Sequence, residues 1–454
     1  MKKKKIRTAI ASFLAMTTVV ACLGGCAGAG NSGETGNNTG NEASVSTDSN
    51  SATGNNDSST SANTDDSANQ SNSSDASDSS ADASSAASET SSTNASTDAG
   101  DTTNVGKETM RDITPTELVA EMTTGWNLGN TFDAWSEGKG SLSDETSWGN
   151  PKTTKEMIDA VKDKGFNTIR IPVTWAGHMG SAPDYTVDEE WIERVEEVVN
   201  YCLDDGMYVI LNSHHEESWR IPDNAHIDAV DEQHRALWTQ IATHFEKYGD
   251  HLIFEGLNEP RVKGGENEWN GGTSEGRQCL DRLNQSFVDV VRATGGNNEK
   301  RLLLITSFAS SASTTTIACL KIPEDDHLGV SIHAYTPYQF TYHTGDASEQ
   351  FVWDGSAKMD IINVMSDLKR FFIDKGIPVI LTEYGAVDKD KNNEEVCKWV
   401  TEYLTRAKNV GIPCVWWDNG LYNTGNEYFS IFNRRELTWY REDVADTIVG
   451  MYKD

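Results

Sequence analysis

The N-terminal part of the chain lacks the residues that build a hydrophobic core. Residues 31–110 contain no aromatic residue, no Leu, no Ile and no Pro, and their only larger apolar side chains are two Val and one Met. Such a segment cannot bury enough apolar surface to offset its conformational entropy, which excludes a folded domain there. We therefore predict a disordered Ser/Asn/Asp/Thr-rich linker over residues 27–110 and one folded domain over residues 111–454.

Basic residues are scarce as well. The chain has 38 Lys and Arg against 70 Asp and Glu, and its formal net charge is −32. Residues 31–110 contribute −12 and residues 1–30 contribute +5, so the predicted domain carries −25. So acidic a surface repels phosphate groups, which argues against nucleic acid as the partner. A neutral ligand is compatible with this charge.

Cysteine is sparse and follows no metal-binding pattern. The seven Cys include no C-x-x-C pair, so their spacing indicates neither a zinc site nor a disulfide framework. We expect the five between Cys202 and Cys414 to be buried free thiols. The triplet His214-His215-Glu216 lacks the H-E-x-x-H spacing of zinc-dependent proteases. We expect no metal and no cofactor.

The first residues resemble an export signal. Residues 2–7 are basic, and the apolar stretch 10–23 is too short to span a bilayer comfortably. Small residues before Cys26 resemble a bacterial lipoprotein box, whereas Ala27-Gly28-Ala29 offers ordinary cleavage as the alternative. We predict a lipoprotein-type signal peptide over residues 1–26, with lipidation at Cys26. The protein is then extracellular and held at a bacterial cell surface by its lipid anchor alone.

Short apolar stretches recur through residues 111–454. Eight of them are typical of strands covered on both faces, because they are apolar without clean alternation: 126–130, 168–173, 207–211, 252–257, 301–305, 328–332, 378–381 and 414–417. Amphipathic segments of helical period lie between them. Eight strand–helix units indicate an α/β fold, a single (β/α)8 TIM barrel. A doubly wound sheet is the rival, but it would need a Gly-rich loop after its first strand, and no G-x-G-x-x-G occurs there.

Nearly every predicted strand ends in polar or aromatic residues, and in a barrel these ends converge on one face, where active sites form. Glu259 follows the fourth strand and Glu383 ends the seventh, so the two carboxylates should face each other across the barrel mouth. Glycoside hydrolysis requires such a pair, with one carboxyl protonated and the other ionised. Arg170 can keep one carboxylate ionised, and Glu255 is expected to be a buried structural carboxylate paired with an Arg. Further side chains can bind a sugar or the catalytic pair: His214, Asn258, His333 and Tyr335.

These segments resemble glycoside hydrolase family 5. Asn258-Glu259-Pro260, with Glu383-Tyr384-Gly385 downstream, is similar to the family's catalytic motifs, and residues 125–130, 167–175 and 416–420 resemble its endoglucanase subfamily 4. The resemblance implies a (β/α)8 fold and retention of anomeric configuration, with Glu259 as the proton donor and acid/base and Glu383 as the nucleophile. It also implies a surrounding shell and an aromatic platform under the sugar: Arg170, His214, Asn258, His333, Tyr335 and Trp417, with Trp416 the less favoured platform.

The resulting prediction is a retaining endo-β-1,4-glucanase that hydrolyses internal bonds of cellulose and related β-glucans. Asn130 and Trp219, in the loops after the first and third strands, are added as candidate sugar-binding residues. A xyloglucanase, a lichenase or a β-mannanase would use the same carboxylates and stays open. A non-catalytic sugar-binding lipoprotein is a remote alternative, because both glutamates are present. We expect a β-glucan as the partner, no nucleic acid, membrane contact only through the lipid anchor, and a monomer.

Overall fold

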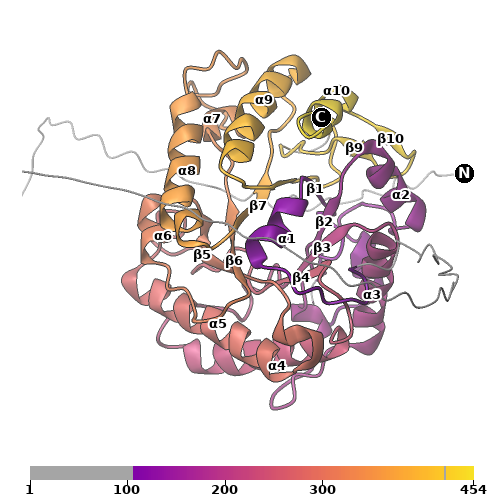
Figure 1. Cartoon of the computed structure of the whole chain (residues 1–454), viewed down its shortest axis with the longest axis vertical. Helices are drawn as coiled ribbons and strands as arrows, with labels where there is room; N and C mark the ends of the chain where they lie inside the picture. Colours follow the sequence, from indigo (N-terminus) through magenta and orange to yellow (C-terminus); the bar gives the residue numbers. More distant parts are fainter. Residues whose placement is uncertain (1–105, 137, 424–425, 454) are drawn as a thin grey trace, which may run out of the picture. The chain divides into compact units, whose positions relative to one another are not determined.

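Eight parallel strands close into a barrel in sequence order (Figure 1). The computed structural model describes residues 106–136, 138–423 and 426–453. Each strand pairs with its neighbours in sequence, and β1 pairs with β8 to close the ring. The (β/α)8 prediction is confirmed, and each predicted stretch overlaps one strand. The strands are β1 (Thr124–Asn127), β2 (Thr168–Ile171), β3 (Tyr208–Asn212), β4 (Leu252–Glu255), β5 (Leu303–Ser311), β6 (Leu328–His333), β7 (Val379–Tyr384) and β8 (Cys414–Trp416).

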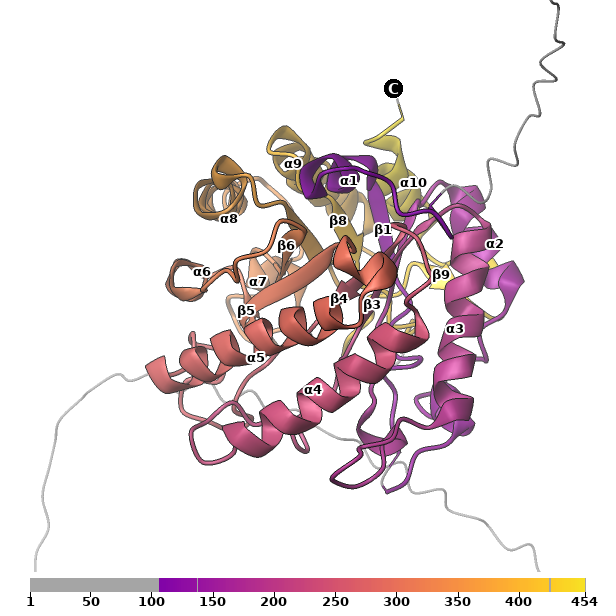
Figure 2. The same ribbon diagram turned by 60° about the horizontal axis from the view of Figure 1, so that its bottom comes forward.

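Helices surround the barrel and connect its strands (Figure 2). One main helix follows each strand in turn: α2 (Lys155–Lys164), α3 (Glu189–Asp204), α4 (Ile227–His244), α5 (Ser274–Ala293), α6 (Thr314–Cys319), α8 (Lys358–Phe371), α9 (Asn393–Asn409) and α10 (Glu442–Gly450). Shorter elements lie in the loops: α7 (Tyr338–Thr341), the 3-10 turns η2 (Leu142–Thr146), η3 (Ala176–His178), η4 (Gly296–Glu299) and η5 (Ile373–Lys375), and a hairpin of β9 (Phe432–Asn433) and β10 (Thr438–Trp439).

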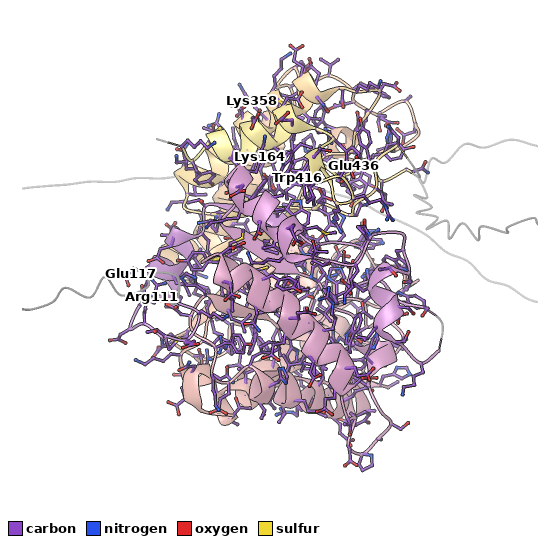
Figure 3. The ribbon with its side chains drawn as sticks, turned by 90° about the vertical axis from the view of Figure 1, so that its right-hand side faces the viewer. Arg111, Glu117, Lys164, Lys358, Trp416 and Glu436 are labelled. Atoms are coloured by element: carbon purple, nitrogen blue, oxygen red, sulfur yellow. The ribbon has the colours of Figure 1, made fainter. Side chains whose placement is uncertain are left out.

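The barrel interior is filled with apolar side chains at its N-terminal end. Residues that point inward from the strands, among them Ile210, Ile253 and Ile380, form a cluster separate from the layer between strands and helices. Helix α1 (Pro115–Glu121) closes this end by adding Leu118 to the inner cluster. It starts with a capping box, in which the Thr114 side chain accepts from the Glu117 backbone N–H and the Glu117 side chain accepts from the Thr114 backbone N–H. Glu117 lies at the periphery of the domain in Figure 3. Polar chemistry is therefore left to the opposite end, called here the C-terminal face.

The folded part begins before the predicted boundary at residue 111. The Gly249 amide donates to the Lys107 carbonyl at 2.6 Å, and the His251 amide donates to the Gly106 carbonyl at 3.0 Å. Gly106 has φ +90° and lies against the His251 ring, where a Cβ atom would clash. The composition gave no sign of this contact, because backbone hydrogen bonds hold the segment and apolar burial does not.

The predicted signal peptide (residues 1–26), the predicted lipidation site Cys26 and the predicted linker up to residue 105 lie outside the described residues. Within the part of the chain that the structure describes, no helix is both long and apolar enough to cross a membrane.

The cysteines at positions 202 to 414 are all free thiols. Cys202, Cys279 and Cys414 are buried as expected, and burial raises the pKa of each of these thiols. Cys397 is only half-buried, and the expectation of burial is wrong for Cys319, which is exposed at the end of α6. Helix α6 has only six residues, and two residues in its middle face the core, so its last residue points to solvent.

Candidate active site

Arg170 is at the centre of the polar cluster on the C-terminal face. It is fully buried on β2, and strand alternation directs it into the barrel while its β2 neighbours point outward. Burial lowers the pKa of Arg170, but the carboxylates of Glu255 and Glu383 more than offset this and hold the guanidinium charged. Its hydrogen bonds reach Glu255 at 2.7 Å, Glu383 at 2.8 Å, Asn127 at 3.0 Å and Asn258 at 2.7 Å.

Glu255 is a structural carboxylate beneath the site, as predicted. It is fully buried at the end of β4 and accepts from the Asn212 amide at 3.0 Å and from the Ser331 hydroxyl, besides Arg170. The Ser331 hydroxyl also lies 2.6 Å from the Thr382 hydroxyl. With its oxygens occupied by donors, Glu255 supports Arg170 and is not free for chemistry.

Glu383 is the penultimate residue of β7, and donors hold both of its oxygens. Arg170 Nη1 donates to Oε1 at 2.8 Å, and the Tyr335 hydroxyl donates to Oε2 at 2.8 Å. His333 Nδ1 lies 3.4 Å from Oε2. Hydrogen bonds of this kind are strongest to an anion, so the arrangement favours an oriented carboxylate.

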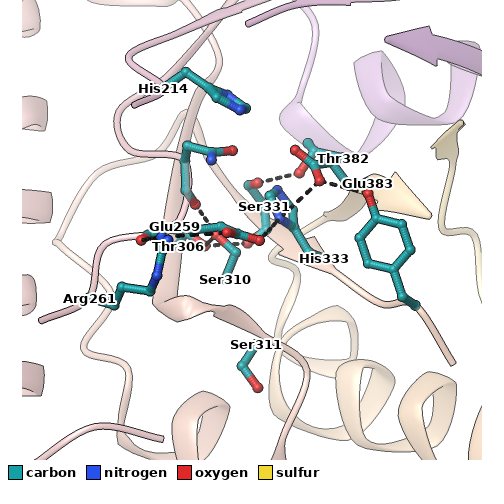
Figure 4. Close-up of polar contacts among 12 residues, drawn as sticks. His214, Glu259, Arg261, Thr306, Ser310, Ser311, Ser331, His333, Thr382 and Glu383 are labelled. Carbon is teal, nitrogen blue, oxygen red and sulfur yellow. Dashed lines mark hydrogen bonds and ion pairs between the residues drawn. The ribbon is translucent and has the colours of Figure 1, made fainter. Parts of the chain in front are cut away.

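Glu259 follows β4 and is half-buried. Its Oε1 lies 2.9 Å from His333 Nδ1, so His333 stands between the two carboxylates in Figure 4. One oxygen of Glu259, one oxygen of Glu383 and a His333 ring nitrogen all lie within 4.8 Å of one another. Retaining glycosidases keep their carboxyls about 5 Å apart, whereas inverting enzymes need ~6.5–9.5 Å to admit a water. The spacing suits the retaining geometry.

The two carboxyls titrate as a coupled pair. Burial raises the pKa of Glu383, and the nearby Glu259 carboxylate raises it further, against the opposing effects of His333 and Arg170. Burial also acts to raise the pKa of Glu259, but the hydrogen bond from His333 and the charge of Arg261 outweigh it and hold that pKa low. Two carboxyls this close hold one proton between them over a range of pH.

The side-chain amide of Asn212 sets the tautomer of His214. The backbone N–H of Val173 donates to Asn212 Oδ1 at 3.0 Å, which fixes the orientation of the Asn212 side chain. Asn212 Nδ2 then donates to His214 Nδ1 at 3.1 Å. Because Nδ1 accepts, the proton of the neutral ring is on Nε2. Burial lowers the pKa of His214 well below its ordinary value, so the ring stays neutral. His214 is therefore built to donate one hydrogen bond from Nε2.

Trp417 offers a ring face, and its neighbour Trp416 does not. Trp416 is fully buried in the domain (Figure 3) and donates from Nε1 to the Phe429 carbonyl at 3.0 Å. Trp417 is only half-buried and lies parallel to His214, with ring centroids 5.9 Å apart. Gly129 lies against the Trp417 ring, where a Cβ atom would come within 2.8 Å of it. Of the two tryptophans, Trp417 has the position that a sugar platform needs.

Arg434 joins the loops after β1 and β8, and the sequence analysis missed it. Its Nη1 donates to the Gly129 carbonyl at 2.9 Å and to the Thr131 hydroxyl at 2.8 Å. Its Nη2 donates to the Asp418 carbonyl at 2.5 Å and to Asp418 Oδ1 at 3.1 Å. Asp418 is fully buried in this contact and directly follows Trp417 in the sequence. The contact between Arg434 and Asp418 therefore fixes the backbone next to Trp417. No local pattern around Arg434 announces this role, because all its partners are remote in sequence.

A bulge in β5 supports the segment that carries Glu259, and it too was missed. Ala309 and Ser310 have φ values of +54° and +49°, a left-handed conformation that costs about 1–2 kcal/mol per non-Gly residue. The bulge lets the Ala309 amide donate to the Pro260 carbonyl at 3.0 Å and the Ser310 hydroxyl donate to the Asn258 carbonyl. The bulge therefore holds the backbone carbonyls of the two residues that flank Glu259.

Two further predicted sugar-binding residues, Asn130 and Trp219, make their hydrogen bonds to residues outside the carboxylate pair. Asn130 is half-buried after β1 with φ +54°, and its amide donates to Asp133 at 3.0 Å. The Trp219 indole donates to Glu216 at 2.6 Å, and the Arg220 guanidinium lies 4.8 Å from the centre of its ring. The structure thus places Trp219 in a buried polar network of the loop between β3 and α4.

Among the residues that the structure describes, two groups of side chains bring possible metal ligands together: Glu259, His333 and Glu383, and Asp133, His214 and His215. The first group is the carboxylate pair itself, in which His333 Nδ1 is a hydrogen-bond partner. In the second, His214 Nε2 carries a proton and has no lone pair to give. Both groups suit hydrogen bonding to a polar substrate better than metal coordination.

Comparison with known proteins gives consistent results. The family described as Cellulase (glycosyl hydrolase family 5) matches residues 130–423. Endoglucanase A of Ruminococcus albus is 62% identical over 341 residues, which are 75% of this chain and 93% of that protein. A solved GH5-4 broad specificity endoglucanase from Ruminococcus champanellensis, with bound cellotriose, is 46% identical at a TM-score of 0.72, covering 75% of this chain and 99% of that one. XEG5A, a GH5 xyloglucan-specific endo-β-1,4-glucanase from a metagenomic library, is 45% identical at a TM-score of 0.71, covering 73% and 97%.

Proposed function

The chain belongs to glycoside hydrolase family 5, in its endoglucanase subfamily 4, and on that premise we propose that Glu259 and Glu383 are the catalytic pair of a retaining endo-β-1,4-glucanase. The observation that carries the proposal is the pair itself, with carboxylate oxygens within 4.8 Å of each other and His333 between them. This separation leaves no room for a water opposite the acid, so direct attack by a carboxylate fits it.

In the first step Glu383 attacks the anomeric carbon, and Glu259 gives its proton to the leaving glycosidic oxygen. Arg170 and Tyr335 orient the attacking carboxylate and favour its charge. A sugar chain that covers the exposed part of Glu259 removes water from it and disfavours its charged form. Substrate binding therefore moves the proton shared by the pair toward Glu259, where the leaving group needs it.

In the second step a water molecule releases the sugar from Glu383. Once Glu383 is esterified it carries no charge, and the repulsion that favours protonation of Glu259 is gone. Glu259, now a carboxylate, takes a proton from the water as the water oxygen attacks the anomeric carbon. The ester bond breaks, Glu383 recovers its charge, and Glu259 holds the proton again.

Sugar binding at the cleavage point is assigned to three side chains. Trp417 provides an apolar face, and His214 donates from Nε2. Asn258 Oδ1 is bound by Arg170 at 2.7 Å, which leaves the amide NH2 of Asn258 to donate to a sugar hydroxyl. Asn130 and Trp219 remain candidates for contacts further along the chain of sugars.

The polymer is proposed to have a β-1,4-glucan backbone, as in cellulose. Xyloglucan is the second candidate, because one of the similar solved structures is a xyloglucan-specific enzyme and another is of broad specificity. Both polymers share the backbone that the carboxylate pair would cleave.

The enzyme is further proposed to be a secreted monomer, tethered to a bacterial surface through a lipid on Cys26. The basic and apolar segments of residues 1–23 and the small residues before Cys26 support export and lipidation. Mass analysis of the mature N-terminus tests this point, since an unmodified peptide that begins after Ala29 would reject the anchor.

The activity is tested with the full chain on carboxymethylcellulose, mixed-linkage β-glucan, xyloglucan, glucomannan and xylan. A fast loss of viscosity on β-1,4-glucans is expected, and it should disappear in Glu383→Ala and Glu259→Ala. Glu394→Gln is the matched control, because Glu394 is exposed on α9. Activity confined to mannan or xylan would contradict the proposed substrate.

A further inference from the structure

Arg261 contacts the Glu259 carboxylate but has no part in the steps above. Its Nη1 donates to the Glu259 carbonyl at 3.0 Å and lies 3.6 Å from Glu259 Oε2. His333 binds the other oxygen, Oε1. Figure 4 shows Arg261 and His333 approaching Glu259 from different sides. The two oxygens of the proposed acid/base therefore face an imidazole and a guanidinium.

The position of the Arg261 charge is fixed by three other contacts. Its Nε donates to Glu268 at 2.9 Å, and its Nη2 lies 3.3 Å from Glu217. Its guanidinium lies 4.4 Å from the centre of the Trp269 ring, a cation–π contact. The side chain is only 9% exposed. A guanidinium held on all these sides cannot swing away from Glu259 during the reaction.

We propose that Arg261 is a positioning residue for the second step, an inference that rests on the proposed roles of Glu259 and Glu383. Its guanidinium stabilises Glu259 as the carboxylate that takes a proton from water when the glycosyl-enzyme is hydrolysed. A fixed positive charge at this distance favours the anion. The first step needs Glu259 neutral, and there the same charge is a cost. Glu217 and Glu268 reduce that cost by partly compensating the guanidinium.

Several other groups act on Glu259, and the test has to separate Arg261 from them. They lie around Glu259 at the ends of the neighbouring strands: His215 after β3, His333 on β6, Tyr335 and Tyr342 after β6, Glu383 on β7, and Glu427 after β8. Glu217, also after β3, contacts Arg261 itself. The guanidinium of an arginine is charged at every pH used in such an assay. Its removal therefore changes the charge beside Glu259 equally at every pH.

The test is the pH profile of kcat/KM on a soluble β-1,4-glucan, measured with the full chain. Arg261→Gln should move the alkaline limb up by about 0.5–1 pH unit, because the pKa of Glu259 rises when a neighbouring cation is lost. Arg261→Lys keeps the positive charge, so its alkaline limb should lie close to that of the wild type. Glu217→Gln should move the limb the opposite way, since it removes an anion and leaves Arg261 less compensated.

A second readout isolates the hydrolysis of the glycosyl-enzyme. A dinitrophenyl β-cellobioside has a leaving group that needs no acid, so its first step does not depend on proton donation by Glu259. With this substrate Arg261→Gln should show a larger burst of dinitrophenol and a slower steady state than the wild type. Glu217→Gln should not enlarge the burst.

The inference is overturned if Arg261→Gln leaves the alkaline limb and the burst unchanged, or if Arg261→Lys and Arg261→Gln are impaired alike, which would mark a packing role. These results differ from a failure of the proposed function. In that case Glu259→Ala itself would hydrolyse glucan polymers at the wild-type rate, whatever Arg261 does.

Discussion

Arg170 Nη1 lies 2.8 Å from Glu383 Oε1, although the two residues are 213 positions apart in the sequence. Arg170 is fully buried, and its second carboxylate partner, Glu255, is fully buried too. Buried charges of this kind are tolerated only when each has its partner. The group that holds the proposed nucleophile is therefore also part of the core, so stability and catalysis depend on the same contact.

Replacing Arg170 should destabilise the fold as well as abolish activity. Arg170→Met leaves Glu255 and Glu383 buried without their cation, and we expect the free energy of unfolding to fall by about 3–5 kcal/mol. Urea denaturation measures this change. Arg406→Met is the control, because Arg406 is over a third exposed and pairs with Glu402 on the surface of α9, and such pairs are worth about 0–1 kcal/mol. An Arg170→Met protein as stable as the control would contradict this assignment.

Tyr335→Phe should move the acidic limb of the kcat/KM profile to higher pH. The Tyr335 hydroxyl bond favours the charged form of Glu383 and so lowers its pKa, against the burial that raises it. Without the bond the pKa of Glu383 rises further, and the ionised nucleophile is lost at a higher pH as the solution is acidified. We expect a shift of about half a pH unit or more. A matched Tyr338→Phe change, at an exposed neighbour, should leave the limb in place, and a shift of the Tyr335→Phe limb toward acid would refute the account.

Trp416→Ala and Trp417→Ala should fail in different ways. Trp416 is fully buried, so its truncation leaves a cavity and should cost about 3–5 kcal/mol of stability. Trp417 is only half-buried, and its truncation should keep the melting temperature nearer that of the wild type. We expect Trp417→Ala to lose about tenfold or more in kcat/KM on cello-oligosaccharides, or ~1.4 kcal/mol of transition-state binding. Equal losses of stability in both variants would argue against Trp417 as the platform.

Arg434 should act on the substrate through Trp417. Arg434→Met releases the loop after β8 from the loop after β1, so we expect weaker binding of oligosaccharides. Because Arg434 and Trp417 belong to one contact network, their effects on kcat/KM should not add, with a coupling energy of about 0.5–3 kcal/mol in a double-mutant cycle. Arg435→Met, at the exposed neighbouring position, is the control. If the effects of Arg434→Met and Trp417→Ala on kcat/KM simply add, Arg434 does not position Trp417.

The sequence predicts the features that a strand carries by itself. All eight strands follow from short apolar stretches, and the burial of Glu255 with an arginine partner was predicted from its position on the fourth of them. Arg434 and the bulge at Ala309 and Ser310 could not be predicted, because they join different strand ends and no local pattern encodes these contacts. The contacts of Gly106 and Lys107 with the domain were not predicted either, because they are backbone hydrogen bonds, which do not depend on amino-acid composition.

The most direct test of the central claim is to trap the glycosyl-enzyme. A 2-deoxy-2-fluoro cellobioside with a good leaving group is incubated with the full chain, and the labelled peptide is identified by mass spectrometry. The account predicts a single sugar ester on Glu383, formed in the wild type and absent in Glu383→Ala. A label on Glu259, or hydrolysis with inversion and no covalent species, would contradict it.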